Sequence, residues 1–135
     1  APAKDQAAAL TRWRRQPNAH ALGITKLMLV PKEHAIVSMS YDHTVKVFDT
    51  SSGTSMLSIE NARKCKFSTI QWDADHDELI MGDELGFVYF WSITSERCIK
   101  TERLRDVGGS SGAVREITIS GSELQASIGS SIETW

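Results

Sequence analysis

The sequence has few cysteines and no long apolar run, and each absence excludes a class of protein. Only Cys65 and Cys98 occur among the 135 residues, and nothing around them suggests the disulfide framework of a small secreted domain. No stretch approaches the roughly 20 consecutive apolar residues of a membrane-spanning helix. The start, APAKDQAAALTRWRRQ, lacks the uninterrupted apolar segment of a signal peptide. We therefore expect free thiols, no membrane span and a cytoplasmic location.

An excess of positive charge is also missing. The chain has 15 Lys and Arg residues against 17 Asp and Glu, which gives a formal net charge of −2. Such a chain is poorly suited to neutralise a phosphate backbone, so dedicated nucleic-acid binding is not expected. With 41% hydrophobic and 24% charged residues, the composition is typical of one compact soluble domain at most.

The sequence does contain an internal repeat. The stretch GITKLMLVPKEHAIVSMSYDHTVKVFD, from Gly23, aligns without a gap on KFSTIQWDADHDELIMGDELGFVYFWS, from Lys66. Apolar residues fall on apolar residues, as where Phe48 meets Trp91. A third, shorter copy, AVREITISGSELQASIGSSIETW, ends at Trp135. A period of forty-odd residues is typical of stacked or radially arranged structural repeats.

Each copy has the pattern of strands rather than helices. The segments VKVF (45–48) and VYFW (88–91) mix β-branched and aromatic residues with alternation, as half-buried strands do. Clusters of turn residues separate four such segments in the complete copies. Four antiparallel strands in about 40–45 residues form one β-propeller blade, so we expect an all-β fold.

The first copy resembles the WD-repeat β-propellers. The segment SYDHTVKVFDTSSG, residues 40–53, is similar to the family pattern Ser-x-Asp-x-Thr-Val-Lys-Val-Trp-Asp followed by a turn with Gly. The segment HALGI, residues 20–24, is similar to the His-Gly motif that precedes a blade. In the second copy, GDELGFVYFWSI keeps the Gly-Asp and the final Trp91. The resemblance covers residues 20–135.

This resemblance implies a partial WD-repeat-like propeller of about two and a half antiparallel four-stranded blades. The expected divisions are a short N-terminal helix or tether at 1–20, a first blade at 21–61, a second at 62–107 and a partial third at 108–135. A closed propeller typically has 4–8 blades. We therefore expect outer faces, carrying residues such as Ile24, Val37 and Ile119, that need further blades or other chains to cover them.

The resemblance also implies a buried hydrogen-bonded tetrad in the first copy. The matching positions are His20, Ser38 and Asp42, with Phe48 where the family has Trp. Phe has no indole N–H, so the chain of hydrogen bonds is expected to end before it.

The aligned positions of the second copy predict no such network. They carry Arg63, Met81, Leu85 and Trp91, which cannot form the tetrad. Packing alone is then expected to hold the second blade. The aligned apolar positions predict the core, with these members: Leu27, Leu29, Ile36, Val45, Val47, Phe48, Ile70, Trp72, Leu79, Val88, Phe90, Trp91, Ile117 and Leu124.

Two short motifs suggest chemistry that their context does not favour. Asp73, Asp75, Asp77 and Glu84 have the oxygen-ligand spacing of a calcium loop, but the sixth position lacks the required Gly. The stretch GGSSG, residues 108–112, matches a nucleophile elbow, yet no His follows it. A solvated acidic turn and an inter-blade loop are the favoured interpretations. We expect no catalytic residue, metal site or cofactor, and a calcium-binding or hydrolytic propeller is the least favoured alternative.

The main functional hypothesis is a non-enzymatic scaffold for protein–protein interaction. The strands carry the packing, so binding should use loops held on a rigid scaffold. The resemblance implies that the loops before the first strand and between the second and third strands share one face. The candidate partner-binding residues there are Tyr41, His43, Arg63, Lys64, Glu84 and Leu85. The alternative is a structural subunit that pairs through exposed blade edges.

Overall fold

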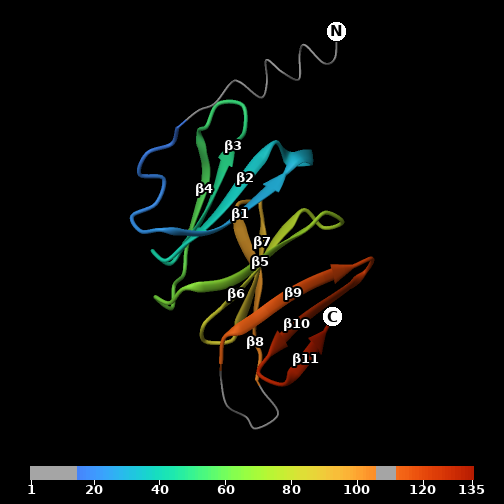
Figure 1. Ribbon diagram of the computed structural model, residues 1–135. Coiled ribbons are helices and arrows are strands. Elements are labelled where there is room, and N and C mark those ends of the chain that lie inside the picture. Colours follow the sequence, from blue (N-terminus) through green and yellow to red (C-terminus); the bar gives the residue numbers. More distant parts are fainter. Residues whose placement is uncertain (1–14, 106–111) are drawn as a thin grey trace, which may run out of the picture.

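A computed structural model describes residues 15–105 and 112–135 of the protein. Within these residues the chain forms eleven strands and one short 3₁₀ turn, arranged as three antiparallel sheets in series (Figure 1). No helix in the described ranges is long and apolar enough to cross a membrane. The expected N-terminal helix, and most of the GGSSG stretch, lie outside the described residues.

The first sheet follows the repeat pattern from β1 to β4. Its order is β1-β2-β3-β4, with β1 at Ile24–Val30, β2 at Ala35–Ser40, β3 at Thr44–Asp49 and β4 at Ser55–Glu60. The turn between β1 and β2 holds the 3₁₀ turn η1 at Pro31–Glu33, which ends at His34 in a left-handed conformation. His43, also left-handed, ends the turn between β2 and β3.

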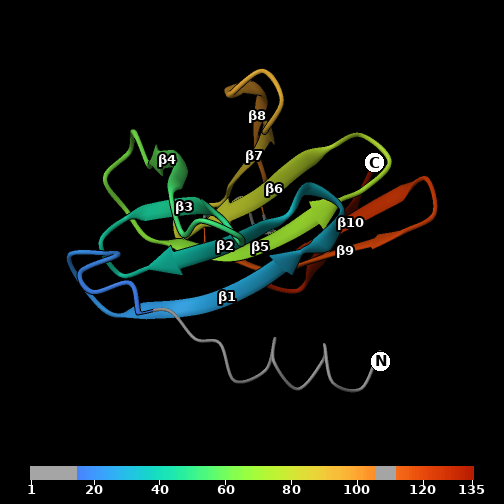
Figure 2. The same ribbon diagram turned by 90° about the horizontal axis from the view of Figure 1, so that it is seen from above.

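The second sheet repeats this order and the third is shorter. The second has the order β5-β6-β7-β8, with β5 at Phe67–Asp73, β6 at Glu78–Asp83, β7 at Phe87–Ser92 and β8 at Arg97–Arg103. The third has the order β11-β10-β9, with β9 at Val114–Ser120, β10 at Glu123–Ile128 and β11 at Ser131–Thr134. Seen from above, β1, β5 and β9 lie along one side of the molecule, while β4 and β8 lie along the other (Figure 2).

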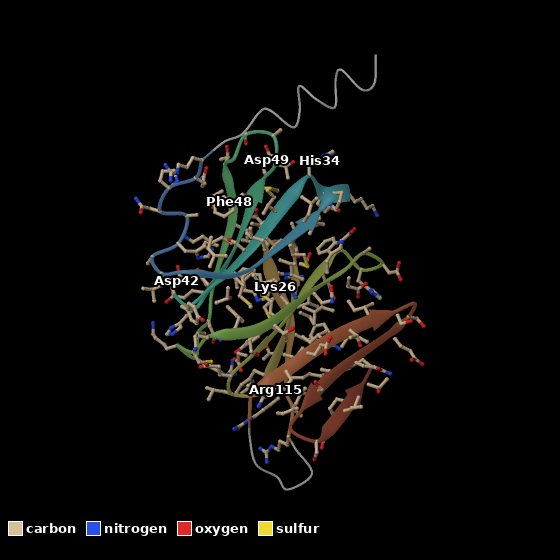
Figure 3. The ribbon with its side chains drawn as sticks, in the orientation of Figure 1. Lys26, His34, Asp42, Phe48, Asp49 and Arg115 are labelled. Atoms are coloured by element: carbon tan, nitrogen blue, oxygen red, sulfur yellow. The ribbon has the colours of Figure 1, made fainter. Side chains whose placement is uncertain are left out.

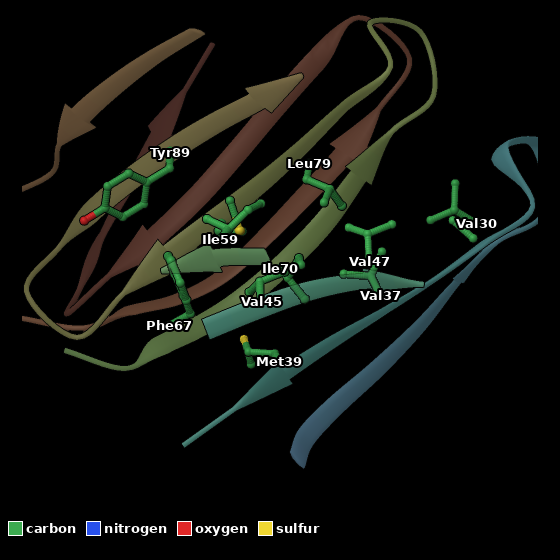
Figure 4. Packing of buried hydrophobic residues seen from close by; sticks show 12 residues of the cluster. Val30, Val37, Met39, Val45, Val47, Ile59, Phe67, Ile70, Leu79 and Tyr89 are labelled. Atoms are coloured by element: carbon green, nitrogen blue, oxygen red, sulfur yellow. The ribbon is translucent and has the colours of Figure 1, made fainter. Parts of the chain in front are cut away.

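Two apolar clusters hold the sheets together. The first lies between the first and second sheets (Figure 4) and contains Val30, Ala35, Val37, Met39, Val45, Val47, Ile59, Phe67, Ile70, Leu79, Met81 and Tyr89. The second lies between the second and third sheets and contains Ile80, Val88, Phe90, Leu104, Val114, Ile117, Leu124, Ala126 and Ile128. Because the second sheet is covered on both faces, the middle residues of its central strands, 79–81 in β6 and 88–90 in β7, are all buried.

One glycine allows the third sheet to approach closely. A Cβ at Gly82 would lie 2.5 Å from Cβ of Val114, which is too close for any side chain. Gly82 therefore lies where β9 packs across β6. Because it has no side chain, the two strands can approach closely, and Val114 is fully buried at this contact.

The predicted faces of the first sheet are wrong for five residues, of which Ile36 and Phe48, predicted as core, are only half-buried and line a pocket on the outer face. Leu27 and Leu29, predicted as core, are 64% and 61% exposed, whereas Val37, predicted on an outer face, is fully buried. The register pairs Leu27 with Ser38 and Met28 with Val37, so alternate residues of β1 point to opposite faces. Both sets in β1 are apolar, and the sequence alone therefore does not show which set faces inward.

The outer face of the third sheet is mainly polar, contrary to prediction. Ile119 is half-buried and packs against the second apolar cluster rather than facing outward. The opposite face of the sheet carries Glu116, Thr118 and Gln125, which are exposed, together with Ile132. Among the two terminal sheets, only the first presents a broadly apolar outer face.

Candidate functional site

A histidine in the segment before β1 anchors that segment to the first sheet. His20 is 8% exposed; its Nδ1 lies 3.0 Å from Oδ2 of Asp42, and its Nε2 lies 2.6 Å from Oγ of Ser38. The Ala21 backbone N–H also donates to Oδ2 of Asp42, at 3.0 Å. The structure thus brings together three of the four tetrad positions and ties the incoming chain to the turn between β2 and β3.

Hydrogen bonds keep the Asp42 carboxylate ionised. Burial by itself would raise its pKa, but donation from the Thr44 hydroxyl, the Ala21 N–H and His20 outweighs burial and lowers the pKa to about 2. Thr44 is close to both groups, with its Oγ1 2.9 Å from Nδ1 of His20. A threonine of β3 therefore joins the network that the sequence comparison assigned to four other residues.

Phe48, the fourth predicted tetrad position, lies beside the network without a hydrogen-bonding group to offer. It is half-buried and lines a shallow pocket on the outer face of the first sheet, together with Ser38, Ile36, Ile24 and Leu27. Figure 3 labels Phe48 and Asp42, which come from the third strand and from the turn that precedes it.

The second sheet has a polar network of its own, which corrects the prediction that packing alone holds it. Its centre is Asp83, at the end of β6, which is fully buried. Asp83 accepts hydrogen bonds from the Tyr89 hydroxyl and from Nδ2 of Asn61, the latter at 3.1 Å. It also accepts the backbone N–H groups of Leu85 and Phe87, at 2.9 and 3.0 Å.

This network escaped the sequence comparison because its residues occupy other repeat positions. In the ungapped alignment Leu85 falls on Asp42, while Asp83 falls on Ser40, two residues earlier. Asn61 reaches Asp83 from the loop between β4 and β5, much as His20 reaches Asp42. The sequence does contain a signal for this network, because Asp83 follows the apolar run LIMG and precedes a turn that contains Gly.

Two arginines gather around one aromatic ring beside this network. The guanidinium carbon of Arg63 lies 3.6 Å from the Phe87 ring centroid, and that of Arg103 lies 5.2 Å from it. Nη1 of Arg63 donates to the Tyr89 hydroxyl at 3.2 Å. We call Arg63, Phe87, Tyr89 and Arg103 the arginine–aromatic cluster. Of these four, only Arg63 was predicted from the sequence; Arg103 lies opposite Phe87 in the β7–β8 register.

Burial and hydrogen bonding hold Tyr89 in its neutral form. Burial is the main cause that raises the pKa of its hydroxyl well above the ordinary value, and the neighbouring Asp83 raises it further. Burial, followed by the charge of Asp83, also raises the pKa of the Cys65 thiol. Both groups therefore act as neutral hydrogen-bonding partners of the buried carboxylate.

The six predicted partner-binding residues all lie in turns and loops at the same end of the strands. Tyr41 and His43 are in the β2–β3 turn, Arg63 and Lys64 in the β4–β5 loop, and Glu84 and Leu85 in the β6–β7 turn. His43 and Lys64 each contact a residue at the end of β4 or in the β4–β5 loop. The His43 carbonyl accepts the Asn61 N–H at 2.9 Å, and Lys64 pairs with Glu60 at 3.6 Å.

Lys66, which the sequence analysis did not select, connects two of these turns. Its ammonium lies 3.2 Å from Oε1 of Glu84 and 5.1 Å from the Tyr41 ring centroid. Tyr41, Lys66 and Glu84 also line one small pocket between the first and second sheets. We call these three residues the inter-sheet surface.

The calcium-loop pattern does not form a site. Asp73 accepts the Asp75 N–H at 3.1 Å and lies 2.8 Å from Nδ1 of His76, within the β5–β6 turn. Glu84 lies past the other end of β6 and pairs with Lys66. In the part of the chain that the structure describes, no group of three or more His, Cys, Asp or Glu side chains is arranged to hold a metal.

Comparison with known proteins supports the fold through structure. No protein-family model matches the chain, and no curated protein sequence does. Solved structures do match, among them U3-55K (TM-score 0.73, 22% identity, 87% of this chain and 37% of that one), the WD40 repeats of RRP9 (0.71, 22%, 87% and 36%) and the computationally designed protein Ika8 (0.69, 17%, 86% and 34%). The chain therefore spans between 34% and 37% of the length of these proteins. At such identities the similarity concerns the fold, and the three sheets have the fold of blades in a WD40-like β-propeller.

Proposed function

We propose that this chain is a non-enzymatic module for protein–protein interaction, a WD40-like propeller segment that presents loops to a protein partner. The observation that carries the proposal is the inter-sheet surface, where Tyr41 and Glu84 come from different sheets and Lys66 contacts both. Tyr41 is 51% exposed, which leaves its ring available to a partner. Aromatic residues at such positions are frequent anchors of protein interfaces.

The scaffold behind this surface supports the proposal. A carboxylate fixes each of the two turns, Asp42 in the β2–β3 turn and Asp83 in the β6–β7 turn. Each accepts backbone N–H groups of its own turn. Turns fixed in this way lose little conformational entropy when a partner binds. A rigid scaffold with exposed loops is suited to recognition rather than to bond-making chemistry.

Peptide selection tests the proposal directly. A displayed peptide library is selected against the full chain, and the affinity of each selected peptide is measured by calorimetry. Tyr41→Ala and Glu84→Lys should each weaken binding by about tenfold, since both remove contacts in the inter-sheet surface. Glu96→Lys is the matched control, because Glu96 is exposed in the β7–β8 turn at the opposite end of the strands. Equal losses in all three variants would overturn the proposal.

A second candidate is a structural subunit whose outer sheet face is covered by another blade or chain. Ile24, Leu27 and Leu29 are 46%, 64% and 61% exposed on the first sheet, which favours coverage of that face. We expect the isolated chain to self-associate at micromolar concentration, and Leu27→Lys with Leu29→Lys should restore a monomer in light scattering. A wild-type chain of 14.9 kDa that stays monodisperse and unfolds cooperatively would contradict this candidate.

A further inference from the structure

The arginine–aromatic cluster places two cations against one aromatic ring. The guanidinium carbons of Arg63 and Arg103 lie 3.6 and 5.2 Å from the same Phe87 centroid. Arg63 and Arg103 are both exposed. Among the described residues, neither has a carboxylate within 4.0 Å. Exposed cations without an acidic partner among the described residues favour the binding of an anion.

The nearby acids that the structure describes are already engaged elsewhere. Glu84 pairs with Lys66 at 3.2 Å, and Glu102 receives the Trp135 indole N–H at 2.6 Å and lies 3.6 Å from Lys100. Asp83 is buried and accepts two side-chain and two backbone donors. Among the described residues, these acids are therefore not available to the cluster, whose cations can pair with an anion from outside.

Arg63 is positioned for recognition before any ligand arrives. Its guanidinium stacks on Phe87, and one nitrogen is fixed by the Tyr89 hydroxyl, which in turn donates to the buried Asp83. This chain of contacts restrains the guanidinium plane, and the remaining N–H donors have no hydrogen-bond acceptor among the described residues. A restrained arginine fork matches the two oxygens of a carboxylate or phosphate group.

The surroundings favour a peptide over a nucleic acid. The chain has a net charge of −2, which disfavours the binding of a continuous phosphate backbone. A single oxyanion group on a peptide meets no such continuous repulsion. Leu85, 43% exposed in the turn that leads to Phe87, offers an apolar contact for a neighbouring peptide side chain.

We propose that the arginine–aromatic cluster binds an oxyanion side chain, a carboxylate or a phosphate ester, on an acidic peptide segment of a protein partner. The proposal rests on the interaction function proposed above and names the chemistry of its ligand. Arg63 and Arg103 provide the charge and the N–H donors. Phe87 and Tyr89 position Arg63.

Fluorescence anisotropy with short labelled peptides tests the proposal on the full chain. One peptide carries a central run of Glu, a second carries phosphoserine in a neutral background, and a third carries Gln at the same places. We expect one or both oxyanion peptides to bind at least about tenfold more tightly than the Gln peptide, and more weakly as salt is raised. The tighter of the two identifies the source of the oxyanion.

Matched arginine variants locate the binding site. Arg63→Gln with Arg103→Gln should lower the affinity for the oxyanion peptide by about tenfold or more, while Arg97→Gln, an exposed arginine at the other end of β8, should change it less than about twofold. Arg103→Gln alone, which leaves the Arg63–Tyr89 hydrogen bond intact, should still lower it severalfold. This single variant keeps the test valid if Arg63→Gln unfolds the loop.

Three results would overturn the proposal. They are equal binding of the Gln and oxyanion peptides, an equal loss in Arg97→Gln, and tighter binding of a single-stranded oligonucleotide than of either oxyanion peptide. If library-selected peptides still depend on Tyr41 and Glu84 while the arginine variants have no effect, the interaction function stands and the oxyanion site fails.

Discussion

The first and second sheets fix their incoming loops with the same device built from different residues. In the first, His20 and the Ala21 N–H bond to Asp42, which lies in a turn with 10% of its side chain accessible. In the second, Asn61 bonds to Asp83, which lies at a strand end with no accessible surface. The comparison teaches that a repeat can keep a loop-to-turn connection while its residues change type and position.

The most damaging single change should be Asp83→Ala. It would leave the Tyr89 hydroxyl, the Asn61 amide and two backbone N–H groups buried without their acceptor, which should cost about 3–4 kcal/mol of unfolding free energy. Urea denaturation followed by tryptophan fluorescence measures the loss. Glu84→Ala is the control, because this neighbouring acid is exposed and pairs only with Lys66. If both variants lose the same stability, the second network does not hold the sheet.

Asp42→Ala should have a smaller effect, of about 1–3 kcal/mol. Its side chain is less deeply buried, and water can replace part of its contacts once the segment before β1 loosens. The same urea experiment measures this loss, together with faster hydrogen exchange at the Ala21 and Thr44 amides, which both donate to Asp42. A loss as large as that of Asp83→Ala would remove the distinction between the two networks.

Acid should weaken the first network because it protonates the Asp42 carboxylate. The pKa of Asp42 is about 2 in the folded chain and 3.8 ordinarily, so the unfolded chain binds the proton more readily. The stabilising contribution is therefore complete above the ordinary value and is lost as the pH falls from about 4 toward 2. Urea midpoints measured across this range should fall for the wild type and less steeply for Asp42→Asn.

The control for the acid experiment is Asp49→Asn. The Ser52 and Ser51 hydroxyls lower the pKa of Asp49 to about 2 as well, but this carboxylate lies at the surface at the end of β3. Solvent screens contacts of that kind, so we expect Asp49→Asn to keep most of the acid sensitivity. If it removed more of the sensitivity than Asp42→Asn, the assignment to the first network would be wrong.

The sequence was sufficient to predict the sheets and one of the two networks. Period-two alternation and turn residues indicated the strands, and the family resemblance pointed to His20, Ser38 and Asp42, which the structure brings together. The face of each strand was harder to predict where both sets of alternate residues are apolar. In β1, Leu27 and Met28 are equally apolar, and only the position of the neighbouring sheet decides which of them is covered.

The arginine–aromatic cluster shows the second limit of sequence reasoning. Arg63 was predicted because it lies in a loop, but the residues that it contacts lie in a strand that is far from it in the sequence. Phe87 and Arg103 are directly opposite each other in the β7–β8 register, and Arg63 reaches them from a different loop. A register fixed by the length of the β7–β8 turn would have placed Arg103 near Phe87. The stacking of Arg63 on the same ring depends on the path of the loop, which the residue pattern does not specify.

The smallest expected effect is that of Leu85→Ala. This variant tests whether a residue's contribution to stability depends on its position in the repeat or on its contacts in the structure. Leu85 falls on Asp42 in the repeat, yet its side chain is 43% exposed, and only its backbone N–H bonds to Asp83. Alanine keeps that N–H, so the variant should lose less than about 0.5 kcal/mol in urea denaturation. A loss above about 1 kcal/mol would mean that the Leu85 side chain has a packing role in the second sheet. The contrast with Asp83→Ala, two residues earlier, would then no longer isolate the carboxylate as the group that fixes the β6–β7 turn.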